Sequence, residues 1–309
     1  MRVVVTGGAG FIGYWTVREF LRFGHEVRVV DNLSRASFSK QLVEMGVELR
    51  RVDVRDLPSL KDALKGCDAV IHLAALISVE ESAEKPELYH EVNATGTLNV
   101  LKASLEAGVE KLIYASSAAV YGEPEQIPVS EDHYTRPNSV YGATKLSGEL
   151  YCRAFHKTYG ISAVILRYFN VYGPGQSHEY AGVISSFLRR VSRGLPPVIY
   201  GDGMQTRDFI HVRDVARLNR LALNLDVGFG VYNVGSGRGM SILELAKLVL
   251  RMAGISEEPV FGPPRPGDIR HSVADISRVR RDLGFSPTIS LEEGLRELLR
   301  EVESHSPEE

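Results

Sequence analysis

Tyr141 and Lys145 stand four residues apart in a segment that has the composition of a helix. Residues at positions i and i+4 lie on one face of a helix, so the ammonium group of Lys145 can lie near the Tyr141 phenol and stabilise its ionised form. A tyrosine, whose pKa is ordinarily about 10, then becomes a usable base at neutral pH. On its own this spacing favours an ordinary exposed pair on a surface helix, so the chemistry depends on the surrounding motifs.

Two serines offer the second group that such chemistry needs. Ser116 and Ser117 follow the apolar run 111–115 and precede Tyr141 by about 25 residues. Ligands of open α/β sheets bind outside the carboxyl ends of the strands, so a hydroxyl that emerges there can share a substrate hydroxyl with the tyrosine. A serine pair at a strand end can equally cap a turn, but its combination with the tyrosine and lysine is much rarer than either part.

A glycine-rich segment, TGGAGFIG at 6–13, follows the first apolar run and opens the first amphipathic segment. Because Gly7, Gly10 and Gly13 have no Cβ atoms, the backbone can turn tightly and a pyrophosphate can approach the helix N-terminus. There the free amides and the helix dipole favour negative charge without any basic side chain. Taken alone, the pattern is equally compatible with a plain glycine-rich turn.

Asp31 ends the second apolar run, about 20 residues beyond the glycine loop. An acid at this place accepts hydrogen bonds from the adenosine ribose of a dinucleotide. Its carboxylate repels a 2′-phosphate, so the sequence predicts NAD rather than NADP, although Arg35 nearby keeps NADP open. The alternative for Asp31 is a turn or helix cap, but strand, loop, helix, strand and acid in this order favour dinucleotide binding.

Elements that would position these residues alternate from the first residue onward, as in βαβ units of a parallel sheet. Six strands are expected, with helices between them that close on Gly24, Gly46, Gly66, Gly108 and Gly160; the strands are 3–5, 27–30, 47–52, 69–73, 111–115 and 163–167. The sequence therefore predicts a doubly wound parallel Rossmann sheet in a domain of residues 1–170. Residues 171–309 are expected to form a smaller, loop-rich substrate lobe, with a segment around 208–235 returning to the first domain.

Composition excludes several other classes. A net charge of −3 from 36 basic and 39 acidic residues provides no field that would gather nucleic acid or a membrane surface. Two cysteines, Cys67 and Cys152, cannot build a disulfide framework, and no Cys/His cluster has metal-ligand spacing, so no metal is expected. No apolar leader and no run of about 20 apolar residues is present. We therefore expect a cytoplasmic protein.

In their order these motifs resemble the extended short-chain dehydrogenase/reductase family, and within it most closely the UDP-glucose 4-epimerases. The resemblance rests on Gly7-x-x-Gly10-x-x-Gly13, Asp31, His72-Leu73-Ala74-Ala75, Asn93, Ser116-Ser117, Tyr141-x-x-x-Lys145 and Arg167-Tyr168-Phe169-Asn170. It implies an NAD-dependent isomerase of galactose metabolism that oxidises a UDP-hexose at C4 and returns the hydride to the opposite face. Tyr141, Lys145 and Ser117 would be catalytic.

The resemblance also implies a set of binding residues. NAD would contact Gly7, Gly10, Phe11, Ile12, Gly13, Asp31, Asn32, Asp53, Val54, Leu73, Ala74, Ala75, Asn93, Ser116, Tyr141, Lys145 and Tyr168. The nucleotide sugar would contact Ser117, Tyr141, Asn170, Val183, Tyr200, Arg207, Arg265, Asp268 and Ser272. Such enzymes commonly form homodimers through two helices, here about 86–107 and 139–159.

Three departures bear on specificity. Epimerases of the family often have a lysine near the cofactor pyrophosphate, where this chain has Ile77. Ser272 stands where a tyrosine narrows the sugar pocket in some relatives, so N-acetylated hexosamines are expected to fit. Ala118 and Ala119 follow Ser117, where dehydratases and decarboxylases of the family have an acid. Epimerisation is therefore favoured, with dehydration, decarboxylation, reduction or non-catalytic NAD binding as alternatives.

Overall fold

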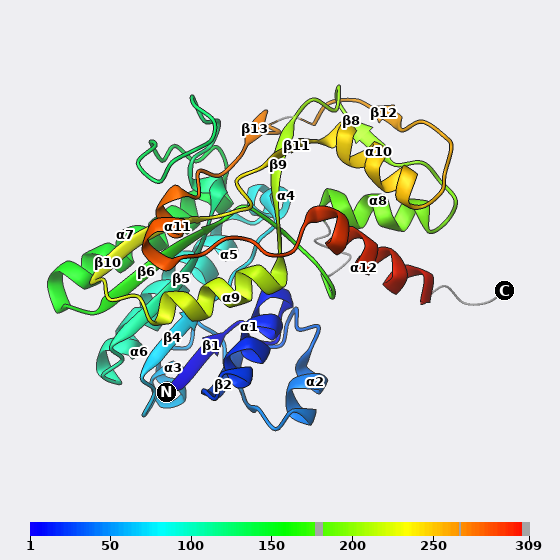
Figure 1. Cartoon of the computed structure of the whole chain (residues 1–309). Coiled ribbons are helices and arrows are strands. Elements are labelled where there is room, and N and C mark those ends of the chain that lie inside the picture. The colour runs from blue at the N-terminus through cyan, green and yellow to red at the C-terminus, as the bar shows by residue number, and fades with distance from the viewer. Residues whose placement is uncertain (177–181, 266, 305–309) are drawn as a thin grey trace.

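Seven parallel strands form the main sheet of the protein (Figure 1). The structure is a computed structural model that describes residues 1–176, 182–265 and 267–304. Across the sheet the order is β3-β2-β1-β4-β5-β6-β10. The bounds are β1 (Arg2–Thr6), β2 (Glu26–Asp31), β3 (Glu48–Arg51), β4 (Ala69–His72), β5 (Lys111–Ser117), β6 (Ser162–Tyr168) and β10 (Phe229–Val234).

Helices cover both faces of this sheet because alternate side chains of each strand point to opposite faces. Val3 and Val5 pack into one core and Val4 into another. The first core is covered by α1 (Phe11–Arg22) and α9 (Val212–Leu223), and the second by α3 (Leu57–Ala63), α6 (Gly96–Glu106) and α7 (Val140–Tyr159). The predicted doubly wound α/β fold is confirmed.

The six predicted strands are confirmed, with one difference at the sheet edge and one strand that was not foreseen. β3 is shorter than the predicted run 47–52, and most of its residues are exposed, as suits an edge strand. The seventh strand, β10, pairs with β6 from the second half of the chain. Each glycine expected to close a helix adopts a positive φ between 69° and 77°: Gly24, Gly46, Gly66, Gly108 and Gly160.

A second group of elements lies beyond the carboxyl ends of the main strands (Figure 1). Its small sheets comprise β7 (Asn170–Tyr172), β8 (Val198–Tyr200), β9 (Thr206–His211), β11 (Gly239–Ser241), β12 (Val260–Gly262) and β13 (His271–Ser272). A separate apolar core gathers α8 (Val183–Val191), α10 (Ile242–Met252) and α12 (Leu291–Ser304). Because α9 and β10 lie in the first group, the chain passes between the groups repeatedly, and the division at residue 170 stays a prediction.

Shorter helices complete the connections. They are α2 (Ser39–Glu44), α4 (Val79–Glu84), α5 (Pro86–Tyr89), a π-helix (His90–Thr95), a 3₁₀ turn (Ala118–Val120) and α11 (Ser277–Leu283). In the part of the chain that the structure describes, no helix is long and apolar enough to cross a membrane.

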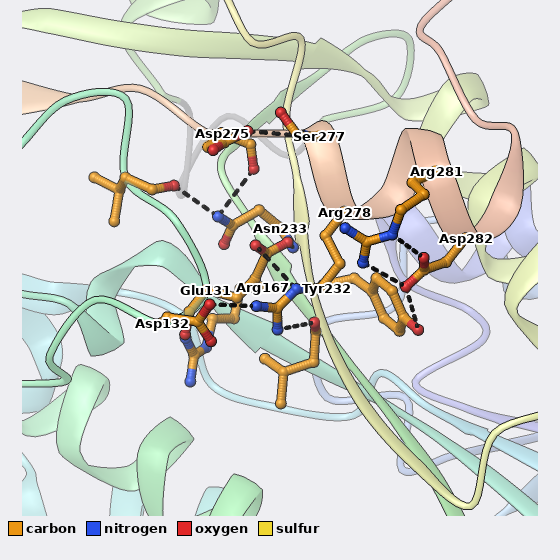
Figure 2. Close-up of polar contacts among 12 residues, drawn as sticks. Glu131, Asp132, Arg167, Tyr232, Asn233, Asp275, Ser277, Arg278, Arg281 and Asp282 are labelled. Carbon is orange, nitrogen blue, oxygen red and sulfur yellow. Dashed lines mark hydrogen bonds and ion pairs between the residues drawn. The ribbon is translucent and has the colours of Figure 1, made fainter.

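Asn233 of β10 joins three segments that are distant in sequence (Figure 2). Its backbone NH donates to Glu131 Oε1 at 2.8 Å, and its side-chain amide donates to the carbonyls of Val129 at 2.8 Å and Asp275 at 3.2 Å. Arg278 of α11 lies 3.6 Å from the Glu131 carboxylate. The long connection after β5 is thus fixed against both β10 and the C-terminal segment.

Candidate active site

The glycine loop lies at the carboxyl end of β1 and opens α1. Gly7 has φ 69°, and a Cβ on it would lie 2.7 Å from the backbone nitrogen of Ala74. A Cβ on Gly13 would lie 2.2 Å from the Gly7 carbonyl oxygen. Gly10 is the N-cap of α1 and has no side chain to satisfy the helix NH groups. The loop therefore brings an open helix N-terminus to the surface of a cavity of about 460 Å³, which we call the main cavity.

The main cavity gathers most of the residues that the sequence predicts for the cofactor. Its walls include Gly7, Gly10, Phe11, Ile12, Gly13, Asp31, Asn32, Val54, Leu73, Ala74, Ala75, Ser116, Ser117, Tyr141, Lys145 and Tyr168. Asn170 and Val183 of the predicted substrate set line it too, and so does Ile77. Neither Asp53 nor Asn93 is among the lining residues.

Those two residues support the wall from behind. Asp53 accepts a hydrogen bond from the Asn32 side chain at 2.8 Å, and Arg55 holds its pKa well below the usual range. Asn93 accepts from the Leu76 backbone NH at 2.8 Å and donates to the Leu76 carbonyl at 2.9 Å. It therefore fixes the segment after β4, the same segment that lines the cavity.

Asp31 is held in place by backbone groups of the two loops beside it. One carboxylate oxygen accepts from the Ala9 NH at 3.1 Å and the other from the Leu33 NH at 2.8 Å. Burial raises the pKa of Asp31, and these two hydrogen bonds oppose the rise. The arrangement fixes the carboxylate at the end of β2, where a ribose hydroxyl can donate to it.

Tyr141 lies in the first turn of α7, which begins as the sequence predicts. Ser139 caps the helix by accepting a hydrogen bond from the Gly142 NH at 3.0 Å. A Cβ on Gly142 would lie 2.6 Å from the Ala119 carbonyl oxygen, so this glycine lets α7 approach the turn that follows β5. That close approach brings Tyr141 near Ser117, whose hydroxyl lowers the pKa of the phenol.

The electrostatics around Tyr141 differ from the sequence expectation. Burial raises the pKa of Tyr141, and the group that lowers it is Ser117 rather than Lys145. Lys145 is 4% exposed, and burial lowers its pKa to about 8. Its Nζ lies 4.6 Å from the centre of the Tyr114 ring. The phenol of Tyr141 is therefore protonated at neutral pH, while the ammonium of Lys145 keeps most of its charge. Desolvation disfavours the charged form of each group, so it raises the pKa of the tyrosine and lowers the pKa of the lysine.

The sequence did not predict the buried ion pair between Glu149 and Arg167, which contacts Ser116. Ser116 donates to Glu149 Oε1 at 2.5 Å, and Arg167 binds both oxygens of the same carboxylate, at 2.9 and 2.6 Å. Glu149 and Arg167 are each 6% exposed. Arg167 also donates to the Tyr121 hydroxyl at 2.9 Å, and Figure 2 shows it beside Glu131. This network fixes the end of β5 against α7 and β6.

Tyr168 is anchored at its far end. Its hydroxyl donates to Asn219 of α9 at 2.6 Å, and burial raises its pKa far above the usual range. With the hydroxyl occupied in this way, Tyr168 contributes to the cavity wall as a neutral aromatic ring and not as an acid or base.

The other predicted substrate residues lie around a second cavity of about 560 Å³. Tyr200, Arg265 and Asp268 line this second cavity together with Asp202 and Arg270. Arg265 stacks on Tyr200, with 4.2 Å between the guanidinium carbon and the ring centre. The structure thus distributes most of the predicted substrate residues between the two cavities.

Arg207 and Ser272 accompany this second group without lining either cavity. Arg207 is mostly buried and forms an ion pair with Asp268. Ser272 of β13 stands opposite Arg207 in the parallel pairing of β13 with β9. Arg265 also lies 3.7 Å from Glu80 of α4, the helix that follows the main-cavity segment ending at Ile77.

Comparison with known proteins places this arrangement in a family. The model of the NAD dependent epimerase/dehydratase family matches residues 3–235. A putative UDP-glucose 4-epimerase of Methanocaldococcus jannaschii is 37% identical over 307 residues, which cover 98% of this chain and 99% of that protein.

Solved structures agree with the sequence comparison. The UDP-N-acetylglucosamine 4-epimerase of Methanobrevibacter ruminantium, in complex with UDP-N-acetylmuramic acid, is 39% identical with a TM-score of 0.93 and covers 99% of both chains. The Thermus thermophilus UDP-glucose 4-epimerase, in complex with NAD, is 40% identical with a TM-score of 0.90 and covers 99% of this chain and 100% of that one. The glycine loop, Asp31 and the Ser117, Tyr141 and Lys145 group are thus set in a scaffold shared over nearly the whole length. The chain belongs to the NAD-dependent epimerase/dehydratase family.

Proposed function

We propose that the protein is a UDP-hexose 4-epimerase that interconverts UDP-galactose and UDP-glucose. One observation supports this reading above the others in the family. Among the described residues that line the main cavity, the one acid is Asp31, at the end of β2. Ala118 and Ala119 occupy the turn after Ser117, so the reacting end of the cavity has a base, a hydroxyl and an ammonium, but no acid for dehydration or decarboxylation.

The residues present fit NAD at the main cavity. The glycine loop is a cradle that a Cβ would fill, the uncapped N-terminus of α1 suits a pyrophosphate, and Asp31 suits a ribose diol. When bound, NAD accepts a hydride from C4 of the sugar and gives it back to the opposite face. We assign the cofactor contacts to the residues that line this cavity.

The proton chemistry falls to three side chains. Tyr141, once ionised, accepts the proton of the sugar 4-hydroxyl and returns it after the sugar has turned. Ser117, which lowers the pKa of the phenol, positions that hydroxyl and relays its proton. Lys145 lines the same cavity and brings a positive charge to the reacting groups at neutral pH.

The decisive experiment is an incubation of the purified protein with UDP-galactose and no added nucleotide. Anion-exchange chromatography should show conversion to an equilibrium mixture of UDP-galactose and UDP-glucose, because the hydride is returned in each cycle. A 4-keto-6-deoxy product would instead establish a dehydratase. Stoichiometric release of reduced nucleotide would establish a dehydrogenase.

N-acetylated UDP-hexosamines form a second substrate class in this proposal. Ser272 is small and is paired with Arg207, the ion-pair partner of Asp268 in the second cavity, and a structural relative that is 39% identical is a UDP-N-acetylglucosamine 4-epimerase. Turnover of UDP-N-acetylgalactosamine is therefore expected beside turnover of UDP-galactose. Conversion of UDP-galactose without any reaction of the N-acetylated sugar would contradict the pocket argument.

The proposal includes a cytoplasmic homodimer. Cys67 and Cys152 are free and buried, as suits a reducing compartment. Leu105 of α6 and Leu150 and Tyr159 of α7 expose 39%, 59% and 54% of their surface, which supports a contact between copies through these helices. Light scattering of the purified protein tests the dimer, and a Leu150→Arg variant should shift the mass to that of one chain.

A further inference from the structure

Arg35 and Glu81 face each other at the adenosine end of the main cavity. Arg35 follows β2 by four residues and lines the cavity in the same stretch as Asp31 and Asn32. Its Nη2 donates to both oxygens of the Glu81 carboxylate, at 2.9 and 2.7 Å. The partners are 46 residues apart, and Glu81 belongs to α4 rather than to the cavity wall.

Glu81 is itself held firmly by a buried scaffold. Tyr89, which is fully buried, donates its hydroxyl to Glu81 at 3.0 Å, and Lys85 donates to it at 3.1 Å. The hydroxyl of Tyr89 in turn accepts the Ser78 backbone NH at 3.0 Å. The Glu81 carboxylate therefore has a fixed position, and Arg35 cannot turn toward a ligand without giving up a bidentate charged contact.

An arginine shortly after the second strand is the group by which enzymes of this fold bind the 2′-phosphate that distinguishes NADP from NAD. Arg35 stands at that place and, taken by itself, would oppose the repulsion that Asp31 exerts on the same phosphate. The carboxylate of Glu81 offsets the charge of the guanidinium and engages its Nη2 through both oxygens. Glu81 and Asp31 thus both disfavour a 2′-phosphate. Glu81 does so by engaging Arg35, and Asp31 does so by direct repulsion.

We propose that Glu81 is a specificity-determining residue that withholds Arg35 from the 2′-phosphate, so that NAD is selected by Glu81 and Asp31 together. This inference rests on the proposed function in one respect, the location of the adenosine ribose at Asp31. Glu81 does not touch the cofactor in this assignment, and it acts through the position and charge of Arg35.

The test is a competition on the intact enzyme. Parent and Glu81→Gln proteins are incubated with an equal, saturating mixture of NAD and NADP, freed of unbound nucleotide and denatured, and the released nucleotides are quantified by chromatography. Glu81→Gln frees Arg35, so the ratio of bound NADP to bound NAD should rise about tenfold, as expected for one charge-assisted hydrogen bond. The readout does not depend on turnover.

Three variants make the result specific. Glu84→Gln removes the same charge from an exposed position of α4 and should leave the parent ratio unchanged. The double variant Arg35→Gln with Glu81→Gln should lose the gain, which excludes a contribution from the released Lys85. Glu81→Asp keeps the charge but draws the carboxylate back by one methylene, and a smaller rise is expected.

Each outcome separates the inference from the proposed function. If Glu81→Gln binds NAD at the parent level and its NADP ratio stays at the parent value, the inference is overturned while the enzyme assignment stands. If the parent retains neither nucleotide, the proposed function itself fails. Should Glu81→Gln not fold, as judged by its thermal melt, Glu81→Asp decides the question, and an unchanged ratio in that variant refutes the role of Glu81.

Discussion

The two cavities hold charge in different ways. At the glycine loop of the main cavity the positive potential comes from backbone NH groups at the start of α1, and glycines shape the wall. At the second cavity it comes from arginine side chains that are already engaged by carboxylates of the lining: Arg270 with Asp202, and Arg207, behind the wall, with Asp268. A backbone cradle is ready before its ligand arrives, whereas the side-chain pairs would have to exchange partners to bind the diphosphate of the proposed substrate. The first arrangement suits a cofactor that stays, and the second a substrate that leaves.

Removing the Tyr141 hydroxyl should have the largest effect on activity. Tyr141→Phe is expected to lower kcat with UDP-galactose by about 10³-fold, because the proton acceptor is lost. The amount of bound NAD should not change, since the backbone cradle is untouched. Tyr151→Phe on the same helix is the matched control and should retain parent activity. A Tyr141→Phe enzyme within tenfold of the parent rate would show that another group accepts the proton.

Gly13→Ala should break the backbone cradle selectively. The added Cβ would lie 2.2 Å from the Gly7 carbonyl oxygen, so the loop has to shift, and overpacking of this kind costs about 1–3 kcal/mol. We expect an approximately hundredfold loss of NAD affinity, measured by titration calorimetry. Gly10→Ala, whose Cβ would have its closest contact at 3.3 Å, should be milder. Equal losses in the two variants would contradict the steric account.

The pH dependence of the rate tests the pKa values of Tyr141 and Lys145 in the main cavity. Tyr141 has a raised pKa, so its ionised fraction and the rate should grow about tenfold per pH unit at neutral pH. Lys145 loses its charge above its pKa of about 8, which cancels the gain, so kcat/KM should level off there. The Lys145→Arg variant keeps its cation and should extend the rise to higher pH. A flat profile from pH 6 to 8 would contradict this assignment.

The smallest effect is expected at the second cavity. Arg207→Lys retains the charge but loses the planar donor pair, so KM for UDP-galactose should rise about fivefold while bound NAD and kcat stay near parent values. Arg238→Lys, on the exposed turn between β10 and β11, is the control. A fall in NAD content in Arg207→Lys would show that the two cavities are not independent.

Sequence predicted what short segments fix by themselves. The glycine loop and the spacing of Tyr141 and Lys145 on one helix each depend on one turn or one helix, and the structure confirms these local features. Four of the first six strands, β1, β4, β5 and β6, follow from apolar runs that are buried on both faces or nearly so. Local pattern and tertiary structure agree there because the same residues serve both.

Long-range pairs could not be predicted in the same way. Arg35 meets Glu81, and Glu149 meets Arg167 and Ser116, only after the sheet has brought their elements together. The sequence singles out Arg35, Ser116 and Arg167 for other reasons, but nothing in it pairs them with Glu81 or Glu149. The raised pKa of Tyr141 was missed for a related reason, since spacing describes the neighbour on the helix but not the desolvation imposed by the rest of the fold.

β10 is the last strand of the main sheet to be synthesised, which affects how the sheet can assemble during translation. β6 pairs with β5 on one side and with β10 on the other, and β10 ends at Val234. On the ribosome, the β6 edge of the nascent sheet therefore stays open while residues 169–228, most of them in the other lobe, emerge between β6 and β10. An open edge of this kind is a template for association with other chains. A chaperone that shields β6 during synthesis would be most useful in that interval.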